Sequence, residues 1–143
     1  MSRQNRDSRH LAGTVALYGL LIALAFIFSY VEAMIPFPVP IPGIKLGLAN
    51  LVNVVGLYTV GAAGTAAVAL VRIVLVGFTF SNPGSMMYAL AGGVFSLAAM
   101  ILAKKCGWFG KTGVSILGGI FHNIGQLTMA AYITGTGGVF SYL

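Results

Sequence analysis

Long apolar segments alternate with short connections that are rich in proline, glycine or charge. An α-helix rises about 1.5 Å per residue, so about 20 residues cross the ~30 Å hydrocarbon core of a bilayer. The pattern therefore predicts an all-α membrane protein, a compact bundle of five transmembrane helices. The predicted spans are 11–34, a second from 45 or 46 to 61, then 65–80, 85–103 and 112–134.

The connections differ in chemistry. Proline occupies every second position from 36 to 42. Because proline donates no backbone hydrogen bond and disfavours a helix before it, this segment is predicted to be an extended crossing. Residues 61–64 and 81–84 are predicted to be short turns, the latter from its Ser-Asn-Pro-Gly sequence.

The composition supports a membrane location. Hydrophobic residues make up 58% of the 143 residues and charged residues only 7%, against roughly 25% charged residues in soluble domains. We therefore expect a basic tail over residues 1–10 and a single transmembrane domain over 11–143, in contact with the lipid bilayer.

The net charge of +6 comes from basic residues near the ends of the spans. Because cytoplasmic loops are enriched in Lys and Arg, the N-terminus and the 104–111 connection are predicted to be cytoplasmic, in a multi-pass protein of the cell membrane. Aromatic residues do not interleave with these charges as in a nucleic-acid surface, so no nucleic-acid partner is expected. The basic residues in question are Arg3, Arg6, Arg9, Lys104, Lys105 and Lys111.

A few polar side chains interrupt the apolar spans. Arg72 lies near the middle of the third span, where an arginine costs about 2.5 to 3.5 kcal/mol and normally has a partner. Glu32 is the only acidic residue in or beside a span, so the two are predicted to pair. The polar residues of the spans lie at similar predicted depths, which favours one solute pocket open to the outside. The predicted lining is Glu32, Lys45, Asn50, Asn53, Arg72, His122 and Gln126.

A structural interpretation stays open beside the pocket. Buried amides in membrane proteins often serve as hydrogen-bonding links between helices, worth ~0.6 kcal/mol each. Arg72 and Glu32 would then form only a structural ion pair. If a pocket exists, its cations favour a small anionic or hydrogen-bond-accepting solute. The sequence offers no metal-ligand spacing and no catalytic motif, so no cofactor, metal or catalysis by this chain alone is expected.

Small residues recur along the first span. Such spacing lets two helices approach closely, because helix association in lipid depends on packing. The stripe packs either within the bundle or against a partner protein. It consists of Ala12, Ala16, Gly19 and Ala23.

Several segments together resemble the Gx transporter family, whose members are usually labelled heptaprenyl diphosphate synthase component I. They are SYVEAMIP at 29–36, PGIKLGLAN at 42–50, Arg72, AGG at 91–93, VSILG at 114–118 and HNIGQ at 122–126. This family is similar to the S components of energy-coupling-factor transporters, which are six-helix bundles. The resemblance implies a sixth helix, which would begin near residues 139–143.

Two functions follow from the resemblance. As an S component, the chain would capture a small solute from outside and dock on a transmembrane coupling subunit driven by ATPase subunits. Asn123 would join the pocket, and the stripe of small residues would form the docking surface. Taken literally, the family label implies an accessory subunit of a prenyl-lengthening enzyme. That chemistry needs Mg²⁺ held by clustered aspartates, and Asp7 is the only aspartate here. An assembly factor without a ligand is a third option.

Overall fold

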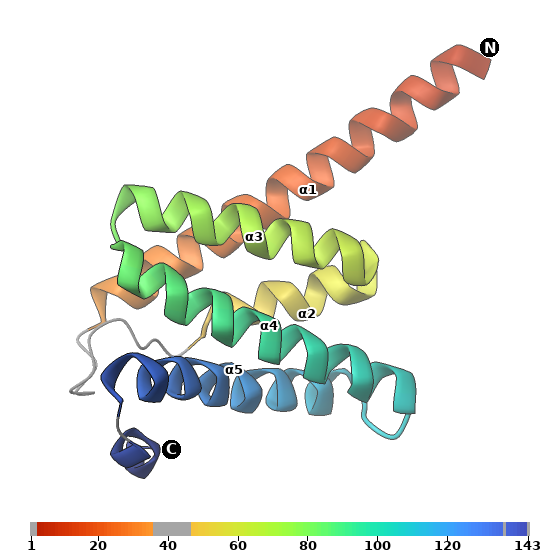
Figure 1. Cartoon of the computed structure of the whole chain (residues 1–143). Coiled ribbons are helices and arrows are strands. Elements are labelled where there is room, and N and C mark those ends of the chain that lie inside the picture. The colour runs from red at the N-terminus through yellow and green to blue at the C-terminus, as the bar shows by residue number, and fades with distance from the viewer. Residues whose placement is uncertain (1–2, 36–46, 136, 143) are drawn as a thin grey trace.

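The computed structural model describes residues 3–35, 47–135 and 137–142. These residues form five α-helices and one short 3-10 helix, so the predicted all-α architecture with five helices is confirmed (Figure 1). The proline-rich crossing lies outside the described residues. The elements are α1 (Arg3–Met34), α2 (Asn50–Thr59), α3 (Gly61–Thr79), α4 (Pro83–Cys106), α5 (Lys111–Thr134) and the 3-10 helix η1 (Gly137–Tyr142).

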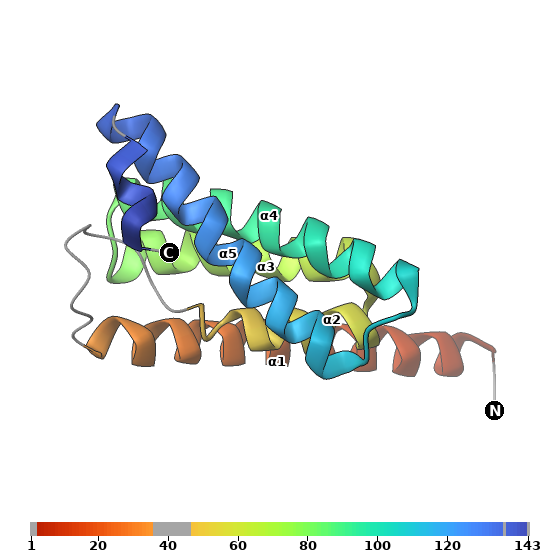
Figure 2. The same cartoon turned by 90° about the horizontal axis from the view of Figure 1, so that it is seen from below.

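The short helix α2 lies at the centre of the bundle. It contacts each of the other four α-helices, and α5 crosses in front of it in Figure 2. With 10 residues it is about 15 Å long, too short to cross a membrane. The prediction of a second span from residue 45 or 46 was wrong at its start, because α2 begins at Asn50. Gly47 has φ of 84°, a conformation that favours glycine, and its carbonyl accepts the backbone N–H of Asn50 at 2.8 Å. The chain therefore turns before α2 begins.

The predicted turn over residues 61–64 was also wrong. The backbone N–H of Val60 donates to the carbonyl of Gly56 at 2.8 Å, which closes α2. Gly61, with φ of 79°, then reverses the chain direction and opens α3 at once. Alanine has the highest helix propensity, so Ala62 and Ala63 continue the helix where a turn was expected.

Three helical segments are long and apolar enough to cross a membrane. They are Ser8–Met34, Gly61–Thr79 and Pro83–Cys106. The fifth helix has 24 residues, a sufficient length, but polar residues such as His122 and Gln126 interrupt its apolar sequence. We conclude that this is a membrane protein, and each of its five α-helices carries buried polar residues.

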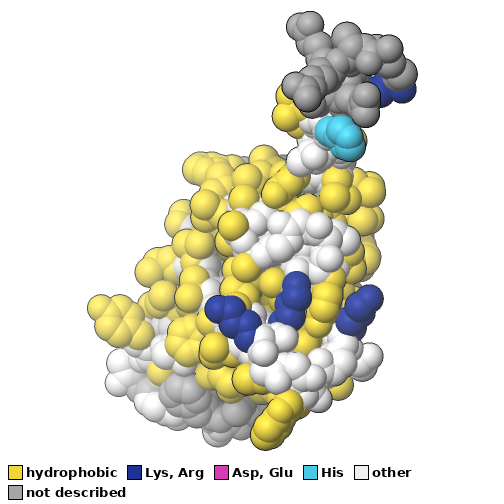
Figure 3. Space-filling model, turned by 90° about the vertical axis from the view of Figure 1, so that its right-hand side faces the viewer, with side chains coloured by type: hydrophobic (Ala, Val, Ile, Leu, Met, Phe, Trp, Pro, Cys, Tyr) yellow, Lys and Arg dark blue, Asp and Glu magenta, His cyan; other side chains and the backbone are white. Residues whose placement is uncertain are grey.

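Both basic segments lie at one end of the molecule. The first part of α1 projects beyond the other helices toward the side where α4 connects to α5 (Figure 1). The exposed Lys104, Lys105 and Lys111 belong to that connection, and Figure 3 looks onto this end. This arrangement is the one that the positive-inside prediction requires, with both segments on the same side of the membrane.

Candidate functional site

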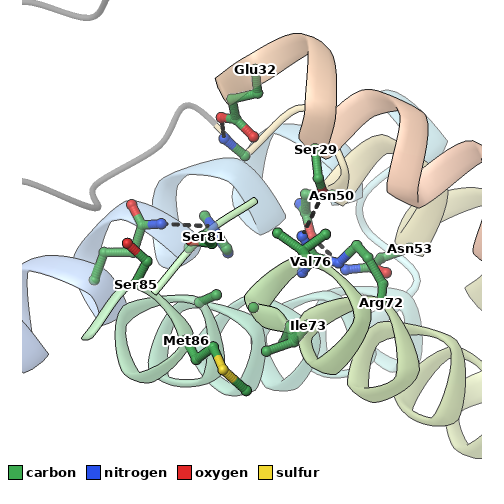
Figure 4. A pocket seen from close by; sticks show the side chains of 15 residues that line it. Ser29, Glu32, Asn50, Asn53, Arg72, Ile73, Val76, Ser81, Ser85 and Met86 are labelled. Atoms are coloured by element: carbon green, nitrogen blue, oxygen red, sulfur yellow. Dashed lines mark hydrogen bonds between the residues drawn. The ribbon is translucent and has the colours of Figure 1, made fainter. Parts of the chain in front are cut away.

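Polar side chains from all five α-helices line one small cavity beside the start of α2 (Figure 4). Its volume is about 20 Å³, room for about one water molecule. The lining therefore gathers hydrophilic groups in an apolar bundle without leaving a large void. The buried polar residues of the lining are Ser29, Glu32, Asn50, Asn53, Arg72, Ser85, His122 and Gln126.

Arg72 reaches from α3 to α1. Its guanidinium Nη1 donates to Oγ of Ser29 at 3.2 Å, and the Ser29 hydroxyl donates in turn to the carbonyl of Ala25 at 2.9 Å. Arg72 is only 7% exposed, yet its Nε has no hydrogen-bond partner in the described part of the chain. A buried N–H without a partner is costly, and the described residues supply no acceptor for this group.

The predicted pairing of Arg72 with Glu32 holds in part. The Glu32 carboxylate is close enough to act electrostatically on the guanidinium. It also accepts a hydrogen bond from the backbone N–H of Gly47. Figure 4 shows this bond at the edge of the cavity, away from the hydrogen bond between Arg72 and Ser29. Glu32 thus connects the end of α1 to the residue from which the chain enters α2.

The two asparagines of α2 form a hydrogen-bonded cluster with α4. The amide oxygen Oδ1 of Asn50 accepts from Oγ of Ser96 at 2.7 Å and from Nδ2 of Asn53 at 3.3 Å. The Oδ1 atom of Asn53 has no hydrogen-bond partner in the described residues. The cluster therefore fixes the amide of Asn50 and leaves an acceptor on Asn53. Ser96 was not predicted, because a single serine in an apolar helix carries no signal of its own.

We expect Ser96→Ala to destabilise the protein modestly. The Ser96 hydroxyl is fully buried, and its loss removes one of the two donors that bond Oδ1 of Asn50. Such hydrogen bonds in membranes are worth ~0.6 kcal/mol on average and up to ~1.7 kcal/mol. Thermal unfolding in detergent measures the change. Thr128→Ala is the control. Thr128 lies on the exposed surface of α5, and its hydroxyl donates to the carbonyl of Ile124 in the same helix. Equal unfolding temperatures in the two variants would contradict this role for Ser96.

His122 and Gln126 lie one helical turn apart on α5, as their spacing predicted. Gln126 Nε2 and His122 Nε2 are 3.2 Å apart. Two glycines make room for the imidazole ring. A Cβ atom on Gly47 would lie 2.9 Å from His122 Cδ2, and one on Gly92 would lie 2.8 Å from Cε1. The ring is thus held between the start of α2 and the middle of α4.

Two predicted lining residues are not placed at the cavity. Lys45 lies outside the described residues. Asn123 is exposed and does not line the cavity. It follows His122 directly, and successive residues on a helix point about 100° apart, so its side chain faces away. The stripe of small residues on α1 is exposed, so it does not pack against the part of the chain that the structure describes. Its members are Ala12, Ala16, Gly19 and Ala23.

The fold and the site together define a class: a helical membrane protein with a buried polar cluster at the centre of its bundle. Residues 21–143 match the protein family described as heptaprenyl diphosphate synthase component I, and the chain belongs to this family. Comparison with curated proteins and with solved structures gave no match.

Proposed function

We propose that this chain is the solute-binding membrane subunit of an energy-coupling-factor-type transporter, an S component. The observation that carries the proposal is a set of three buried side-chain atoms beside one cavity that have no hydrogen-bond partner among the described residues: Nε of Arg72, Oδ1 of Asn53 and Nδ1 of His122. Each such atom costs about 1 to 3 kcal/mol. Helix packing alone does not offset this cost, whereas a bound solute with complementary groups can form hydrogen bonds with these atoms.

The chemistry of the cavity indicates the kind of solute. Arg72 supplies a cation and an N–H donor, Asn53 supplies an acceptor, and Gln126 with His122 supplies further hydrogen-bonding groups. A small molecule with one anionic group and one donor fits this set. Since the cavity holds about one water molecule (about 20 Å³), binding of an organic solute requires the surrounding helices to move apart.

The exposed stripe supports docking on a transmembrane coupling subunit, which ATPase subunits would drive. Positions 12, 16, 19 and 23 point away from the face of α1 that packs into the bundle through Leu21, Ala25 and Ser29. Small side chains on an exposed transmembrane face permit close approach of a partner helix. We further propose that the basic end faces the cytoplasm of the cell, which places the cavity toward the outer side.

Docking is tested by Gly19→Leu and Ala16→Leu. Each leucine should separate the partner helix from α1 and lower copurification of the coupling subunit and the ATPases at least tenfold, while solute retention stays unchanged. Ala67→Leu, at an exposed alanine of α3, is the matched control and should behave like the unaltered chain. Undiminished copurification with both α1 variants would rule out docking through this stripe.

A second candidate is an accessory membrane subunit of a prenyl diphosphate synthase, which the description of the matched family favours. In that case the chain would copurify with an aspartate-rich soluble subunit and not with ATPases. Deletion of this chain would also remove the long-chain prenyl product. Copurification from native membranes therefore separates the two functions.

A further inference from the structure

An apolar groove of about 580 Å³ lies on the outside of the bundle between α4 and α5, and it shares no lining residue with the polar cavity. Its α4 wall repeats every four residues, so one face of the helix forms it continuously. Exposed apolar side chains such as Val94 and Leu102 show that the described part of the chain does not cover this face. The wall residues used below are Val94, Ala98, Leu102 and Cys106 on α4, with Phe109 in the connection and Phe121 on α5.

The length of the groove corresponds to one leaflet. From Val94 to Cys106 α4 rises about 18 Å, somewhat more than half of the ~30 Å hydrocarbon core. The groove ends at the α4–α5 connection, where Phe109 lines it and Trp108 is 91% exposed. Exposed tryptophan is typical of the membrane–water interface. A lipid of this leaflet would therefore have its head group at the connection.

One lysine lies at the end of the groove near the α4–α5 connection, on the face of α4 that lines the groove. Lys105 comes seven residues after Ala98, which is two turns along the same face of α4. Lys104 points elsewhere, since its Nζ donates to the carbonyl of Leu57 at 2.6 Å. The Nζ of Lys111 lies 5.5 Å from the ring centre of Tyr58. Lys105 is exposed and is the cation of this connection that the helix geometry directs to the groove.

We propose that this groove binds one acyl chain of an anionic phospholipid, with the phosphate head group on Lys105. The nearly complete apolar lining suits a hydrocarbon chain, and the cation at the interface end suits a phosphate. A single groove-side lysine matches a single phosphate charge better than a diphosphate. The site does not depend on the proposed transport function.

Trp108 is the only tryptophan of the chain, so its fluorescence reports this site in the full protein. Vesicles contain phosphatidylcholine with brominated acyl chains, or phosphatidylglycerol with the same chains, each diluted in unbrominated phosphatidylcholine. From the quenching of Trp108 we expect an affinity for phosphatidylglycerol about fivefold higher than for phosphatidylcholine. This ratio corresponds to about 1 kcal/mol, the contribution of one lysine at an anionic surface. Lys105→Gln should lower this ratio to about one. Lys111→Gln, with the same loss of charge, should keep most of it.

The chain-binding half is tested by native mass spectrometry. Ala98→Phe fills the groove and should reduce the phosphatidylglycerol that remains bound at least fivefold. Ile116→Phe, at an exposed site of α5 outside the groove, should not. Equal quenching by both lipids would mean ordinary boundary lipid and would overturn the proposal. An equal loss of the preference for phosphatidylglycerol in the Lys105 and Lys111 variants would also overturn it. So would displacement of the bound phospholipid by a prenyl diphosphate at a concentration lower than that of the phospholipid.

Discussion

Under the proposed function, replacing Arg72 with methionine is expected to remove the solute that would copurify with this protein. A hydrogen bond to a charged group contributes about 1.5 to 3 kcal/mol, and 1.4 kcal/mol corresponds to a factor of ten in affinity. Retention should therefore fall at least tenfold. Mass spectrometry of small molecules, normalised to the amount of purified protein, measures it. Methionine removes the cost of about 2.5 to 3.5 kcal/mol for inserting an arginine at mid-membrane but leaves the buried Glu32 carboxylate without this cation, so thermal unfolding in detergent is measured alongside.

Two further variants make this result specific. Arg9→Met removes the same charge from an exposed position of α1 and should retain the solute fully. Arg72→Lys keeps the cation but loses the Nε donor and the planar guanidinium, so it should restore only part of the binding. If Arg72→Met retains as much solute as the unaltered chain, the arginine has a structural role only.

Gly125→Ala is expected to cause the largest loss of stability among single methyl additions on α5. A Cβ atom at this position would lie 2.7 Å from the carbonyl oxygen of Ala91 and 2.9 Å from Cα of Gly92. Both atoms belong to the backbone of α4, so relief requires the two helices to separate. Overpacking of this kind costs about 1 to 3 kcal/mol. Because His122 packs against the same part of α4, solute retention should fall as well.

Gly119→Ala is the matched control on the same helix. A Cβ atom there would meet nothing within 4 Å, and alanine favours a helix over glycine by up to about 1 kcal/mol. Thermal unfolding in detergent, followed by helical circular dichroism, compares the two variants. An unfolding temperature for Gly125→Ala equal to that of Gly119→Ala would contradict the close contact between α4 and α5.

The apolar periodicity was sufficient to predict the helices and their approximate ends. It failed where glycine geometry decides the chain direction. Residues 46–49 look like the start of a helix, but Gly47 takes a left-handed conformation and delays α2 to Asn50. Conversely, the glycine at 61 turns the chain in one step, so the small residues after it continue α3.

Helical spacing also predicted which polar residues share a face, as for Asn50 with Asn53 and His122 with Gln126. It did not identify Ser29 or Ser96, because their roles arise only when other helices bring Arg72 and Asn50 to them. The size of the cavity was equally beyond prediction from sequence. It depends on how closely five helices cross, which the glycines opposite His122 and Ala91 determine.

The central claim is that the buried polar groups of several helices bind one solute together. An experimental density map of the protein, purified with the molecule that it retains, tests this most directly. The account predicts density for that molecule between Arg72, Asn53 and Gln126, in a cavity with a volume larger than the present 20 Å³. A map that places the molecule elsewhere, with the cavity still closed around a single water, would contradict it.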